Sequence, residues 1–96
     1  MPATFNFEQL TVDNTTAQSP SPGLVSAGGK KAQKVILTIG QQNARMKINA
    51  APTASAGIVL LVDGMYEFTA YDIISNMQFI SEGAGNTIIN LQYILI

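Results

Sequence analysis

Apolar and polar residues alternate along most of the chain after residue 33, with a period of two residues. Side chains of a strand point alternately to the two faces of a sheet, so this pattern predicts short, mostly half-buried strands. No long segment carries the i, i+3, i+4 spacing of a helix, although Asp72 is expected to cap a single helical turn over residues 73–75. The predicted strands are residues 34–39, 44–49, 58–62, 65–71, 77–81 and 87–96.

Turn residues between these segments predict which strands pair. The turn at residues 40–43 predicts a hairpin of segments 34–39 and 44–49. Asp63-Gly64 is a strong two-residue hairpin signal and predicts that 58–62 pairs with 65–71. Short strands at a spacing of roughly ten residues indicate an all-β fold, a small antiparallel β-sandwich of jelly-roll or immunoglobulin-like type, with a small barrel as the alternative.

The first 29 residues have a different composition, rich in Thr, Ser, Pro and Gly. Residues 4–12 alternate imperfectly and are expected to form an extended arm or an edge strand. The sequence DNTTAQSPSPG at residues 13–23 disfavours a helix, because each proline biases the residue before it toward extended geometry. We therefore predict an extended N-terminal arm over residues 1–29 and a β-sandwich domain over residues 30–96.

Two predicted strands are apolar on both faces. Residues 58–62 are expected to be covered on both sides or to lie at an interface. Residues 87–96 carry no charged side chain and would promote aggregation as a bare edge. This C-terminal strand is therefore expected to be central in its sheet or to pair with a neighbouring subunit.

Charged residues are few and are segregated along the chain. Only 11% of the 96 residues are charged and the net charge is −1, whereas a globular domain has about 25% charged residues. So little charge protects a monomer weakly against association, which favours a homo-oligomer or another assembly. All basic residues lie between positions 30 and 47 and are expected either to dock on an acidic patch of a partner or to form a solvated strand face. A single Arg and a negative net charge argue against nucleic-acid binding.

Residues with catalytic or metal-binding chemistry are scarce. The absence of Cys and His removes thiol nucleophiles, disulfides and the usual metal ligand. Asp63 and Glu67 are a close carboxylate pair, but a turn and a polar strand face explain both. We predict no enzyme activity, no catalytic residue, no cofactor and no metal site. No apolar run approaches the roughly 20 residues of a membrane span, so no membrane partner is expected.

One series of motifs resembles a group of small virion proteins of tailed bacteriophages. In that group, A-R-Y-R-x-D-G precedes a P-T-A-S-x-G loop, a G-D turn, an F-I strand and a final L-x-V-x-Y strand. The resemblance covers about residues 34–94 and differs at Asn49-Ala50, where the group has Asp-Gly, and at Asp63-Gly64, where the order is reversed. The matching pieces here are ARMKI at 44–48, PTASAG at 52–57, Phe79-Ile80 and the closing strand near Tyr93.

This resemblance implies a β-sandwich component of a virion that is assembled in the host cytoplasm. Together with the low charge and the arm, it predicts a capsid decoration or cement protein that binds the major capsid protein, copies of itself, or both. A neck or tail component is one alternative. A carbohydrate-binding module for host attachment, with Tyr66 and Tyr71 as an exposed aromatic pair, is another. The predicted partner-binding residues are Phe5, Phe7, Leu10, Lys30, Lys31, Arg45 and Lys47.

Overall fold

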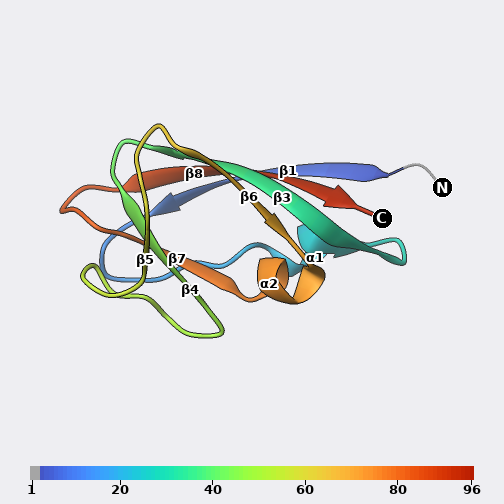
Figure 1. Cartoon of the computed structure of the whole chain (residues 1–96), viewed down its shortest axis with the longest axis horizontal. Coiled ribbons are helices and arrows are strands. Elements are labelled where there is room, and N and C mark those ends of the chain that lie inside the picture. Colours follow the sequence, from blue (N-terminus) through green and yellow to red (C-terminus); the bar gives the residue numbers. More distant parts are fainter. Residues whose placement is uncertain (1–2) are drawn as a thin grey trace.

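The computed structural model describes residues 3–96, which fold into two antiparallel β-sheets with a shared core (Figure 1). Its strands range from two to eleven residues in length, and its two helices are single turns; neither described helix is long enough to cross a lipid bilayer. The elements are β1 (Thr4–Val12), α1 (Pro22–Val25), β2 (Ser26–Ala27), β3 (Lys30–Gly40), β4 (Ala44–Ile48), β5 (Ile58–Leu60), β6 (Met65–Thr69), α2 (Tyr71–Ser75), β7 (Met77–Ser81) and β8 (Thr87–Leu95).

The C-terminal strand β8 is central in the larger sheet. It pairs with β1 along its whole length on one side and with β3 on the other. The far edge of β3 pairs with β6 and, at its beginning, with β2. The smaller sheet has the order β5-β4-β7. The predicted all-β, two-sheet fold is therefore confirmed, and of the two positions expected for the C-terminal strand the chain adopts the central one.

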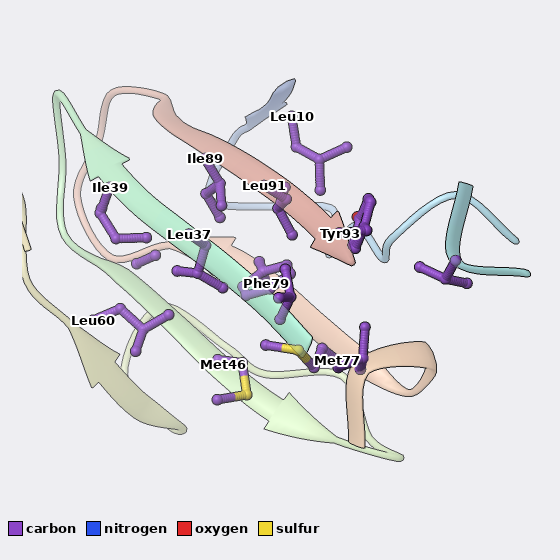
Figure 2. Packing of buried hydrophobic residues seen from close by; sticks show 14 of the residues in the cluster. Leu10, Leu37, Ile39, Met46, Leu60, Met77, Phe79, Ile89, Leu91 and Tyr93 are labelled. Carbon is purple, nitrogen blue, oxygen red and sulfur yellow. The ribbon is translucent and has the colours of Figure 1, made fainter. Parts of the chain in front are cut away.

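Alternating side chains from both sheets fill the space between them, as Figure 2 shows. The inward residues of β3 and β8 are those that the period-two pattern predicts. Burial of one large aliphatic or aromatic side chain contributes about 1.5–3 kcal/mol, so this cluster is the main stabilising feature of the fold. Its large, fully buried members include Leu37, Met46, Leu60, Met77, Phe79, Ile89, Leu91 and Tyr93.

Both predicted hairpins are wrong. Strands β3 and β4 lie in different sheets, because the edges of β3 are already occupied by β8, β6 and β2. Asp63-Gly64 does form a turn, in which the Gly64 amide donates to the Leu61 carbonyl over 3.0 Å. This turn, however, leads from β5 in the smaller sheet to β6 in the larger one. Both turns change sheets instead of reversing the chain within one sheet.

The first strand, β1, is an edge strand of the larger sheet, one of the two possibilities that its sequence left open. After β1 the chain crosses to the smaller sheet, where Gln18 and Phe79 exchange two backbone hydrogen bonds of 2.8 and 2.9 Å. Leu10, Val12 and Val25 belong to the same buried cluster as residues of β3 and β8. The described part of the 1–29 segment thus packs within the sandwich in this chain and does not project from it.

The predicted helical turn near residue 73 is present as α2, but Asp72 does not cap it. The N-cap is Ala70, which has a φ of 79° and no side-chain capping bond. Its amide donates to the Gln33 carbonyl of β3 over 3.1 Å, so the backbone at this point is fixed by the sheet. Asp72 lies in the first turn, where its negative charge interacts favourably with the helix dipole.

Candidate interaction surfaces

Exposed apolar side chains gather around β5 and the connection from β5 to β6. In the connection Leu61 is the most exposed apolar residue, at 57%, and in β6 it is Met65, at 73%. Leu60 is the one residue of the 58–62 segment that is buried in the core. We call this surface the β5 patch; it consists of Ile58, Val59, Leu61, Val62 and Met65.

The backbone beneath the β5 patch is held by specific hydrogen bonds. The Leu61 amide donates to the Tyr66 hydroxyl over 2.7 Å, and the Val62 amide donates to Oδ1 of Asn43 over 2.8 Å. The Asp63 amide donates to the Ile39 carbonyl of β3 over 2.7 Å. These bonds fix the backbone of the connection, so the exposed side chains of Leu61 and Val62 are held in a defined arrangement.

The β5 patch lies where both sheets have an open edge. Among the described residues, β5 pairs only with β4, and β6 pairs only with β3. The continuous apolar run at 58–62 predicts that this segment is covered on both sides or lies at an interface. In the single chain this run is largely exposed, yet none of its residues is among the predicted partner-binding residues.

Two of those predicted residues, Phe5 and Phe7, lie together on the outer face of β1. They are 65% and 59% exposed. Leu10 is different, because the strand turns it to the opposite face, where it packs in the core and is 8% exposed. Leu10 is therefore not available to a partner in this chain.

The predicted basic residues do not form one patch. Lys30 and Lys31 lie at the start of β3, where Nζ of Lys30 donates to Oγ1 of Thr4 over 3.2 Å and Nζ of Lys31 is 5.0 Å from the centre of the Tyr71 ring. Arg45 and Lys47 lie on β4, in the other sheet.

Nearby carboxylates neutralise part of this basic charge. Nε of Arg45 is 3.0 Å from Oε2 of Glu82, and one of its terminal nitrogens donates to the Gly57 carbonyl. Lys34 forms a salt bridge of 3.0 Å with Glu67. Charges that are segregated along the sequence are thus interleaved in space, which weakens the idea of a single electrostatic contact.

A polar cluster beneath β1 ties distant parts of the chain together. Oε1 of Glu8 accepts hydrogen bonds from the Tyr93 hydroxyl at 2.8 Å and from the Ser21 amide at 3.1 Å, and Oε2 accepts from the Ser21 hydroxyl. Burial, assisted by the Glu8 carboxylate, raises the pKa of Tyr93 far above its ordinary value. Through Glu8 this cluster joins β1, the segment after it and β8.

Within residues 3–96, no three potential metal-ligating side chains of the His, Cys, Asp or Glu type gather in one place, and no pocket is found. The chain matches no known protein-family model and has no significant similarity to a curated protein. The β5 patch and the outer face of β1 are therefore the candidate interaction surfaces of the described residues.

Proposed function

We propose that this protein is a non-enzymatic structural component of a bacteriophage virion, acting as a capsid decoration or cement protein. In this role it lies on the capsid surface and stabilises contacts between capsid subunits. Its partners are the major capsid protein and further copies of itself. The motif resemblance over about residues 34–94 supports a virion component, and the surface of the sandwich supports an assembly role.

The β5 patch is the observation that carries the proposal. Monomeric soluble proteins rarely expose contiguous apolar patches larger than roughly a few hundred Å², and patches above that size mark interaction sites. Here five such side chains surround two open sheet edges, in a chain of which only 11% is charged. An exposed apolar surface at open sheet edges can pack against another protein subunit, and we assign it the contact with the capsid.

A carbohydrate-binding role has less support. Tyr66 and Tyr71 are half-buried, the Tyr66 hydroxyl is bonded to the Leu61 amide, and Lys31 lies over the Tyr71 ring. These two tyrosines do not form an open aromatic platform. A neck or tail position shares the features of a decoration protein and differs from it in copy number, so the first experiment measures copy number.

Quantitative mass spectrometry of purified virions, relative to the major capsid protein, tests the proposal. Decoration predicts an abundance comparable to that of the shell subunit, whereas a neck or tail component is present at the copy number of a single ring. Absence of the chain from purified particles contradicts both.

A binding experiment then tests the β5 patch itself. The double variant L61S/M65S is expected to lose binding to capsids that lack the protein, because both apolar contacts are removed from the exposed surface. The variant I96S is the matched control: it makes the same kind of change at another exposed residue, 68% exposed, beyond the end of β8. Loss of binding by I96S as well, or retention by L61S/M65S, would remove the β5 patch from the proposal.

A further inference from the structure

The outer edge of β1 is a second open edge, separate from the β5 patch. Within residues 3–96, β1 pairs with β8 and with no other strand. The Thr11 carbonyl, near the end of β1, accepts a hydrogen bond of 2.8 Å from the Gln18 side chain. The part of the edge that is left for another strand is therefore the beginning of β1, around Phe5 and Phe7.

This part of β1 lacks the features that normally keep edge strands apart. Natural edges are protected by charged residues, prolines, bulges or covering loops. From Thr4 to Val12 the only charged residue is Glu8, which is turned inward and bonded to Tyr93 and Ser21. At the beginning of the strand the outward residues are two exposed phenylalanines, followed by the polar Gln9 and Thr11.

We propose that the β1 strands of two copies of this chain pair antiparallel about a two-fold axis at Asn6. The two larger sheets then become one continuous sheet through the dimer. In the assembly proposed above, this dimer is the contact between copies of the chain. Its biological role rests on that proposed function.

The register at Asn6 follows from the side chains that it brings together. It places Phe5 opposite Phe7 of the other copy, and by symmetry Phe7 opposite Phe5, so that two aromatic cross-strand pairs form on the outer face. Directly opposed residues of antiparallel strands have Cβ atoms about 4.5–5.5 Å apart, a distance at which aromatic pairs stabilise a sheet.

The same register brings opposite charges together on the inner face. Thr4 lies opposite Glu8 of the second copy, and Nζ of Lys30 is bonded to Oγ1 of Thr4 over 3.2 Å. Through Thr4, each Lys30 ammonium therefore lies on the same face of the joined sheet as the Glu8 carboxylate of the other copy. With no like charges facing each other, the edge is complementary to itself, which is why we assign it a second copy and not another partner.

Sedimentation of charge-swapped variants of the full chain tests this pairing. The wild type is expected to dimerise in the micromolar range. F5K/F7K and F5E/F7E alone are each expected to raise the dimer dissociation constant by about ten-fold or more, because like charges then face each other across the axis. Mixing the two variants is expected to restore a heterodimer, since each Lys then faces a Glu. T69K is the control, because it adds a lysine at an exposed residue of β6, away from β1, and it is expected to dimerise as the wild type does.

Three results would overturn the inference: a wild type that stays monomeric throughout the micromolar range, charge variants that dimerise as well as the wild type, or a mixture that stays monomeric. Circular dichroism of each variant establishes that it is folded. Because no capsid is used, a dimer that forms in solution while the chain is absent from virions refutes the proposed function and leaves the pairing intact.

Discussion

The hydroxyl of Tyr93 donates a hydrogen bond of 2.8 Å to Oε1 of Glu8, a residue 85 positions earlier in the chain. Strands β1 and β8 are paired so that Tyr93 lies opposite Asn6, which makes Glu8 its diagonal neighbour on the inner face. Glu8 also binds Ser21, so the first strand, the segment after it and the last strand meet at one carboxylate. This contact attaches the β1 edge to the centre of the sheet.

Replacing Tyr93 with Phe is expected to lower the free energy of unfolding by about 2 kcal/mol, because a hydrogen bond to a charged acceptor is lost without loss of the ring. Urea denaturation followed by circular dichroism measures the change. Y71F is the matched control, since no hydrogen bond of the Tyr71 hydroxyl is found in the described structure, and it is expected to change stability little. Equal stability of Y93F and the wild type would mean that the Glu8 contact contributes nothing.

Stability is expected to fall at alkaline pH through the same residue. Burial and the Glu8 carboxylate raise the pKa of Tyr93 above its ordinary 10.0, so the folded state favours the neutral phenol. This contribution is fully present below pH 10.0 and is lost as the pH rises above that value, since the unfolded chain then releases the proton more readily. Urea midpoints measured across this range are expected to fall more steeply for the wild type than for Y93F, and parallel curves would refute the assignment.

Asp13 is expected to give the opposite pH dependence. Its pKa lies below the ordinary 3.8 because its carboxylate accepts hydrogen bonds from the amides of Thr15 and Thr16 and from the Thr15 hydroxyl. The folded state therefore favours the charged form, and the contribution is present above pH 3.8 and lost as the pH falls through the lower folded pKa. D13A is expected to be less stable than the wild type at neutral pH, with a difference that shrinks in acid. A difference independent of pH would rule out the carboxylate as its cause.

Gly64 is required by close packing in the turn below the β5 patch. A Cβ atom at this position would lie 2.9 Å from the Leu61 carbonyl oxygen and 2.8 Å from a ring carbon of Tyr66. G64A is therefore expected to lose about 1–3 kcal/mol of stability, the usual effect of overpacking. G23A is the control, because a Cβ at Gly23 meets nothing within 4 Å. Thermal unfolding of both variants measures the difference, and equal melting temperatures would contradict this account of Gly64.

The first strand illustrates why the candidate site was only partly predictable. Its sequence indicates one apolar set, but the structure turns Phe5 and Phe7 outward and Leu10 inward. The period of two already separates odd from even positions, so this division was available in the sequence. What was not available is the reason why polar Asn6 and Glu8 face inward: their partners come from the α1 region and from β8.

Pairing of the strands shows the same limit. The segment 77–81 was predicted with the boundaries that β7 has, because an alternating run between turn residues is a local signal. The 40–43 and 63–64 turns were also recognised, but both carry the chain from one sheet to the other. A turn signal shows that the chain changes direction, but it does not show with which strand the next strand pairs.

The sequence alone determined that this chain forms β-strands, which faces of β3 and β8 are buried, and that little charge covers the surface, because these properties depend on the residue types and their local order. Only the tertiary structure decided that β8 lies between β1 and β3, that the basic residues meet carboxylates from other segments, and that the β5 patch and the β1 edge remain open. These features depend on contacts between residues far apart in the chain. Any of several strands satisfies the backbone hydrogen bonds of an edge equally well, so the choice is made by the packing of the whole core.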